Sequence, residues 1–101
     1  NRDGYSVEEL YTKKDSLNGK SIKINAQVVK VSKNIMKRDW VHLQDGTGSA
    51  GTNDIIATSV NSTVKVGDIV TTIGTIKTNA DFGYGYKYSV IIEEAKFTSI
   101  K

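Results

Sequence analysis

The chain has 101 residues, of which 38% are hydrophobic and 25% are charged. This length suits a single domain, and the composition is that of a folded globular chain, which excludes a disordered one. The net charge of +3 permits an anionic partner without requiring one, and the absence of cysteine excludes disulfide bonds and thiolate metal sites.

A short helix is predicted near the start of the chain, over residues 6–17. Ser6 is a favourable N-cap, and Glu9, three positions later, completes the sequence pattern of a capping box. Leu10 and Leu17 lie on one apolar face at helical spacing. We therefore expect this helix to bury both leucines.

Five β-strands are expected in the rest of the chain, because apolar and polar residues alternate there. The predicted strands cover residues 22–32, 40–44, 55–60, 69–76 and 84–93 or beyond. The first alternation slips by one residue at Val29, which indicates a β-bulge that helps a strand curve around a barrel. Polar loops are expected at residues 33–39, between the first two strands, and at residues 77–83, between the last two.

The phase of each strand predicts which side chains face the core. Val41 and Leu43 are expected to point inward, opposite to Trp40, His42 and Gln44.

The fourth strand is ambiguous, because Val70 and Ile76 favour one face while Ile69 and Ile73 favour the other. We take Val70 and Ile76 as the inward pair.

Several segments resemble a known family. They are residues 19–24 (GKSIKI), 28–31 (VVKV), 34–48 (NIMKRDWVHLQDGTG), 51–54 (GTND), 66–70 (VGDIV) and 81–86 (DFGYGY). Together they resemble the OB-fold family of anticodon-binding-like domains, and more closely a group of small bacterial OB proteins, often extracytoplasmic, described as nucleic-acid binders. The resemblance covers about three quarters of the chain, and residues 40–48 are its most specific part.

The resemblance implies an all-β fold, a five-stranded OB-type Greek-key barrel with one N-terminal helix. We expect one domain over residues 1–101, with the helix at about 6–17 and the barrel at about 20–98. Many OB domains carry a helix between their third and fourth strands, but residues 61–65 are too few for one here. The N-terminal helix is expected to cover that end of the barrel instead.

The basic residues Lys33, Lys37 and Arg38 precede Trp40 and His42. Cations beside an aromatic strand face are typical of single-stranded nucleic-acid binding, in which charges contact phosphates and rings stack on bases. Two interpretations of Trp40 stay open. It is either an exposed stacking surface or a side chain packed under residues 33–39, against Met36.

A second aromatic group lies near the end of the chain. Tyr84, Tyr86 and Tyr88 share one strand face at a spacing of two, and Phe82 precedes them. Part of this stripe is expected in the core, since the face continues to Val90. We expect ligand contact at its tip, through Phe82, Tyr84 and Tyr86.

Three other motifs favour structural interpretations. Residues 46–51 match GxGxxG, but a strand is expected after them rather than the helix that a dinucleotide site needs. Asp45 and Asp54 do not fit the spacing of an EF-hand. The sequon at residues 61–63 is a pattern that arises often by chance.

The leading hypothesis is a non-catalytic module that binds single-stranded DNA or RNA through the barrel groove, without a metal or cofactor. The alternative is a cell-envelope module that binds a protein partner in the same groove. No apolar run approaches the roughly 18 residues of a membrane-spanning helix. Because the chain begins at Asn1, removal of an upstream signal, with a periplasmic or surface-tethered location, is an expectation.

Overall fold

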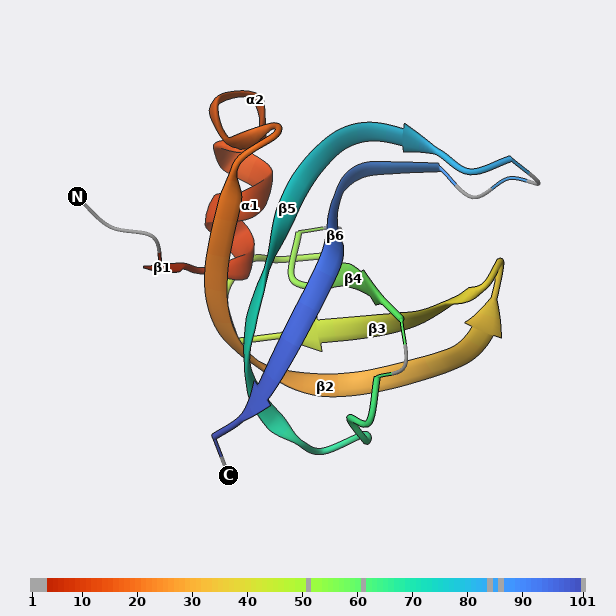
Figure 1. The fold of residues 1–101 in the computed structure, drawn as a ribbon. Helices are drawn as coiled ribbons and strands as arrows, with labels where there is room; N and C mark the ends of the chain where they lie inside the picture. The colour runs from red at the N-terminus through yellow and green to blue at the C-terminus, as the bar shows by residue number, and fades with distance from the viewer. Residues whose placement is uncertain (1–3, 51, 61, 84, 86, 101) are drawn as a thin grey trace.

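The computed structural model describes residues 4–50, 52–60, 62–83, 85 and 87–100. Its elements, in chain order, are β1 (Gly4–Tyr5), α1 (Val7–Thr12), α2 (Lys14–Leu17), β2 (Ser21–Ile35), β3 (Arg38–Gln44), β4 (Ile55–Ser59), β5 (Ile69–Asp81) and β6 (Lys87–Ser99). The prediction of a mostly β chain with helical structure at its N-terminus is confirmed (Figure 1).

The strands form one sheet in the order β1-β2-β3-β4-β6-β5, and β2 also pairs with β5. The last pairing returns the sheet to its second strand, so the five longer strands form a closed ring of pairings. β4 pairs with β6 in parallel, while the other pairings within the ring are antiparallel. This OB-like arrangement agrees with the expected fold. The two-residue strand β1, which pairs in parallel with β2, was not expected.

The predicted bulge in β2 is present. Val28 pairs with Leu43, but the next pair joins Lys30 to His42, so Val29 is the extra residue. The 15-residue strand β2 can therefore pair with β5 through its first half and with β3 through its second half. A bulge increases the local bend of a strand, which lets one strand serve both neighbours.

The predicted inward residues form the core. Val41, Leu43, Val70 and Ile76 are completely buried and belong to one hydrophobic cluster. The ambiguity in the fourth strand is resolved by the exposure of Ile73, which is 46%. The chosen phase of both strands is confirmed.

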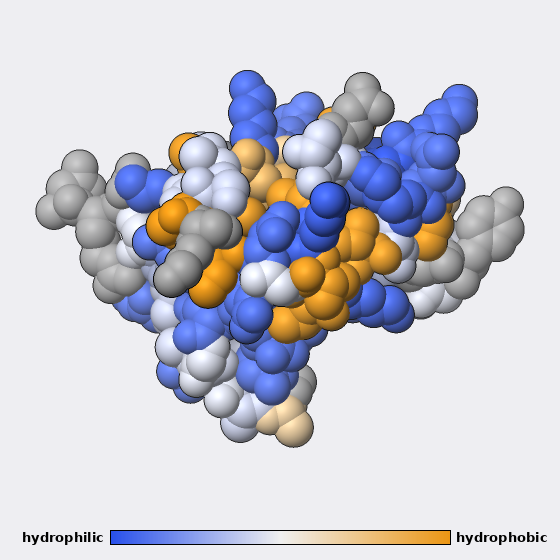
Figure 2. Space-filling view, turned by 90° about the horizontal axis from the view of Figure 1, so that it is seen from below, coloured by the Kyte–Doolittle hydropathy of each residue, from blue (hydrophilic) through white to orange (hydrophobic). Residues whose placement is uncertain are grey.

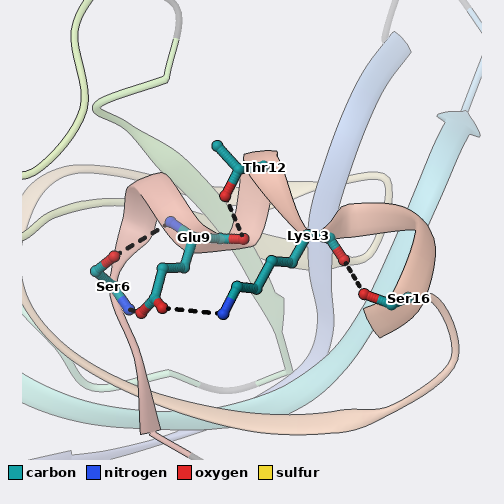
Figure 3. A network of polar contacts seen from close by, with 5 residues as sticks. All are labelled: Ser6, Glu9, Thr12, Lys13 and Ser16. Carbon is teal, nitrogen blue, oxygen red and sulfur yellow. Dashed lines mark hydrogen bonds and ion pairs between the residues drawn. The ribbon is translucent and has the colours of Figure 1, made fainter.

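The capping box at Ser6 is confirmed. The Ser6 hydroxyl accepts the Glu9 N–H at 3.1 Å, and Glu9 Oε1 accepts the Ser6 N–H at 3.0 Å (Figure 3). Leu10 and Leu17 are buried in the same cluster as the strands, as expected. The expectation of a single helix over residues 6–17 is wrong, however. Lys13, at φ −109° and ψ 16°, interrupts it and separates α1 from α2.

Both predicted polar loops are shorter than expected. Residues 33–35 belong to β2 and residues 38–39 to β3, so a two-residue turn replaces the loop at 33–39. Residues 77–81 extend β5, and β6 begins only at residue 87. The β2–β3 and β5–β6 hairpins therefore extend beyond the ring as two arms on the same side of the molecule (Figure 1).

The described part of the segment between β4 and β5 contains no helix, in agreement with the sequence.

Exposed apolar side chains include Val66 of this segment, Ile69 at the start of β5 and Ile100 after β6. Figure 2 views the underside of Figure 1 and shows apolar side chains gathered between hydrophilic ones. Among the described helices, none is long and apolar enough to cross a membrane.

Candidate nucleic-acid interface

The tip of the β2–β3 arm is a tight turn at Met36 and Lys37. Both residues have positive φ, 53° and 66°, which is the backbone of a type I′ turn. Such a turn matches the twist of the flanking strands, and this explains why Lys33 and Arg38 lie in strands rather than in a loop. Neither turn residue is the usual Asn or Gly, so the local sequence carried little signal for it.

Lys33 takes part in a structural contact. Its Nζ atom lies 3.2 Å from Asp39 Oδ2 and donates to the Ser62 carbonyl oxygen at 2.5 Å. Asp39 is only 6% exposed and also accepts the N–H groups of Asn34 and Ser62. This Asp39 node, formed by Asp39, Lys33, Asn34 and Ser62, ties the β2–β3 arm to the segment after β4.

The Asp39 node changes the acidity of its carboxyl group. Burial alone raises the pKa of Asp39, but the N–H groups of Asn34 and Ser62, together with the Lys33 ammonium, hold it below its ordinary value of 3.8. Asp39 is therefore ionised at neutral pH. The charge of Lys33 is balanced within the fold.

Unlike Lys33, which pairs with the buried Asp39, neither of the other two cations is paired with a buried carboxylate in the part of the chain that the structure describes. Lys37 is exposed at the turn and makes no side-chain hydrogen bond or ion pair with the described residues. Arg38, whose side chain is 37% exposed, lies 4.0 Å from Glu93 Oε2, and its guanidinium carbon is 5.4 Å from the centre of the Phe82 ring. This separation permits a cation–π contact between the two arms.

Trp40 is not an exposed stacking surface, and that expectation is wrong. The side chain is 3% exposed, and its indole Nε1–H donates to the Ile35 carbonyl oxygen at 2.8 Å. Phe82 packs edge-on at 5.1 Å between ring centres, and Tyr88 lies at 5.8 Å. Burial under residues 33–39 agrees with the other interpretation, but the partners are the Ile35 carbonyl group and rings of the other arm. Met36, the expected partner, is exposed and does not belong to this cluster.

The aromatic tip of the β5–β6 arm is described in part. Phe82 and Tyr88 are half-buried, and their ring centres are 6.2 Å apart. Tyr84 and Tyr86 lie outside the described residues, so their expected ligand contacts remain predictions. Of the predicted ligand residues, the structure brings together Arg38, Trp40 and Phe82.

His42 occupies a separate polar cluster. Its Nδ1 atom lies 3.2 Å from Asp54 Oδ1, and Gln44 Nε2 donates to the other carboxylate oxygen at 3.4 Å. The Tyr11 hydroxyl donates to the Asp54 backbone carbonyl. Burial, followed by the nearby Asp54 charge, raises the pKa of Tyr11. His42 thus joins β3 to the loop before β4.

The glycine-containing loop after β3 caps α1. Asp45 Oδ2 accepts the Val7 N–H at 2.9 Å, and the Thr47 hydroxyl accepts the Glu8 N–H at 3.0 Å. Gly48 has φ +84°, and a Cβ atom there would lie 2.3 Å from the Thr52 carbonyl oxygen. The glycine therefore serves loop geometry, as expected. No group of three or more potential metal ligands occurs among the described residues.

Sequence reasoning missed the Asp45 cap and the contact of Arg38 with Glu93. In both, the partners are far apart in the chain, and no local spacing signals them.

Glu93 and Arg38 line a groove of about 380 Å³, which also includes Lys37, Val60 and Glu94. This groove lies between the β2–β3 arm and the point where β4 and β6 separate.

Comparison with solved structures supports the fold. The chain matches "Crystal structure of a putative aspartyl-tRNA synthetase from Leishmania major Friedlin" with a TM-score of 0.70 and 18% sequence identity. The match covers 99% of this chain but only 21% of that one, so the chain spans about a fifth of its neighbour. At this identity the similarity establishes the fold alone. Neither a scan against protein-family models nor a search of curated proteins finds a match.

Proposed function

We propose that this domain is a non-catalytic binder of single-stranded nucleic acid and that the ligand lies across the tips of the two arms. The observation that carries this proposal is the position of Arg38, which places a partly exposed guanidinium beside the Phe82 ring and next to the accessible Lys37. A cation that can contact a phosphate beside a ring that can stack on a base is the pattern of sequence-tolerant single-strand binding. The fold similarity to a tRNA synthetase chain supports the same ligand class.

The contacts divide among three residues. Lys37 contacts phosphate as an accessible charge, and Arg38 exchanges its 4.0 Å contact with Glu93 for a phosphate oxygen. Phe82, which is half-buried, presents the exposed part of its ring to a base. We do not propose Lys33, Trp40 or His42 as direct contacts. The Trp40 ring is buried, Lys33 pairs with the buried Asp39 although its side chain is 56% exposed, and His42 bonds to Asp54. Tyr84 and Tyr86 remain in the proposal on the sequence pattern alone.

A titration of fluorescently labelled, mixed-sequence DNA and RNA oligomers tests this proposal. Oligomers of about 12 nucleotides fit the usual site size of an OB fold. Lys37→Ala should weaken binding to every sequence and reduce the salt slope by about 0.7, the value for one phosphate contact on a single strand. Phe82→Ala should weaken binding by roughly 1–3 kcal/mol and leave the slope unchanged.

Lys65→Ala is the matched control, because Lys65 is an exposed lysine in the turn before β5, whose residues Gly67 and Asp68 bond to Val28 of β2 rather than to the arm tips. It should leave both the affinity and the salt slope close to those of the parent. Absence of any anisotropy change up to near-millimolar strand, weaker than non-specific binding of about 10⁻⁴ to 10⁻⁶ M, would contradict the proposal. An equal effect of Lys65→Ala and Lys37→Ala would contradict its placement at the arms.

One observation favours a second candidate, a protein-binding module of the cell envelope. Glu93 and Glu94 line the same groove as Lys37 and Arg38, so the charges there are balanced, and the exposed Val60 adds an apolar surface. Balanced charge with an apolar contact suits a polypeptide better than a phosphate backbone. Detection of a signal or lipidation sequence upstream in the natural protein, together with a failed oligonucleotide titration, would favour this candidate.

A further inference from the structure

A second, smaller hydrophobic core lies outside the main one and joins the two arms. Its buried members are Trp40, Ala80 and Ile91. The half-buried side chains packed against it are Ile35, Ile56, Phe82 and Tyr88. These residues come from or adjoin all five strands of the ring, and none belongs to the main cluster. This arm core is therefore the contact through which one arm can fix the position of the other.

Trp40 occupies the centre of the arm core. On one side, its indole N–H holds the β2 strand through the Ile35 carbonyl oxygen at 2.8 Å. On the other side, its ring contacts Phe82 at 5.1 Å and Tyr88 at 5.8 Å, both of the β5–β6 arm. Arg38 lies two positions before Trp40, and its guanidinium lies over the same Phe82 ring that Trp40 contacts.

We infer that Trp40 is a positioning residue of the proposed single-strand site: it fixes the Phe82 ring relative to Lys37 and Arg38 without contacting the ligand. This inference rests on the proposed function. Its physical basis is preorganisation. Side chains that are already ordered lose little rotamer freedom when a ligand binds. If a substitution makes them mobile, binding must order them again, and the affinity falls by this entropic cost. Release of Arg38 and Phe82 together should weaken binding roughly five- to a hundredfold.

Trp40→Leu tests this role, because leucine keeps an apolar side chain but removes the ring and the N–H donor. Leu43→Ala is the matched control. It alters the same strand on its opposite face, where Leu43 is completely buried in the main core. Affinity is measured for a labelled mixed-sequence DNA 12-mer, or the RNA 12-mer if the parent prefers it, at a temperature at which circular dichroism shows every variant to be folded. Trp40→Phe serves as a milder substitution if Trp40→Leu does not fold.

The expected result has two parts. Trp40→Leu, or Trp40→Phe to a smaller extent, weakens binding without changing the salt slope, whereas Leu43→Ala changes affinity by less than about twofold. In addition, Phe82→Ala costs less in the Trp40→Leu background than in the parent, because Trp40 acts through Phe82. A general loss of stability would not produce this coupling.

The outcomes separate this inference from the proposed function. If the parent binds neither DNA nor RNA, the proposed function fails and the positioning role fails with it. If the parent binds but Trp40→Leu and Leu43→Ala have equal effects, or the Trp40 and Phe82 effects simply add, only the positioning role is overturned.

Discussion

Replacement of Asp39 by alanine should strongly destabilise the fold, because Asp39 connects the β2–β3 arm to the segment after β4. The substitution removes the acceptor of the Ser62 N–H at 2.9 Å and of the Asn34 N–H at 3.2 Å. Ser62 is 7% exposed, so its N–H would be left buried without a partner at a cost of about 1–3 kcal/mol. Asn34 is exposed and can bond to water, which limits its share. The expected total is about 2–4 kcal/mol.

Denaturant unfolding followed by the fluorescence of the single tryptophan measures this loss, since Trp40 adjoins Asp39. Asp68→Ala is the control. The Asp68 carboxylate accepts one exposed N–H, that of Lys65 at 2.9 Å, and its loss should cost less than about 1 kcal/mol. A loss below about 0.5 kcal/mol for Asp39→Ala, the range of ordinary surface substitutions, would refute the reasoning.

The stability difference between the parent and Asp39→Ala should also depend on pH. Because the folded-state pKa of Asp39 is lowered from 3.8, the ionised carboxylate stabilises the fold above pH 3.8, and this contribution is lost as the pH falls through the lower, folded-state pKa. The difference in unfolding free energy between the parent and Asp39→Ala should therefore be largest near neutral pH and shrink in acid. A difference that grows on acidification would contradict this sign.

Three further substitutions test the core and the capping loop by thermal or denaturant unfolding. Leu43→Ala should cost roughly 2–5 kcal/mol, because Leu43 is completely buried, and a cost no larger than that of Ile73→Ala would contradict the phase of β3. Gly48→Ala should cost roughly 1–3 kcal/mol through its positive φ and its approach to Thr52; an unchanged melting temperature would show that the loop can rearrange. Thr72→Val should raise the melting temperature, because the Thr72 hydroxyl is buried without a partner among the described residues, and a lower value would reveal a missing contact.

The sequence predicted features that local patterns control. The capping box at Ser6 depends on residues three apart, and the slip at Val29 depends on simple alternation, so both could be recognised without the fold. The inward phase of Leu43 followed from the same alternation. These signals are short-range, and tertiary contacts reinforce rather than oppose them.

Features that depend on distant partners could not be predicted in this way. Trp40 has the alternation of an outward residue, but Phe82 and Tyr88 of the other arm cover it. The sequence does not signal that Lys33 bonds to Asp39 and Ser62, because Ser62 lies 29 positions away. The turn at Lys37 lacks the residues that usually mark positive φ, so the sequence predicts a loop where the ends of both strands lie.

The central claim is that single-stranded nucleic acid binds across the tips of the two arms. Amide chemical-shift mapping during titration with an unlabelled, mixed-sequence DNA or RNA oligomer tests it most directly. The expected shifts fall on Lys37, Arg38 and Phe82 and spare Val66 and Ile100, which adjoin the start of β5 and the end of β6, away from the tip that joins these two strands. Shifts concentrated at Val66 and Ile100, or no shifts at near-millimolar oligomer, would contradict the claim.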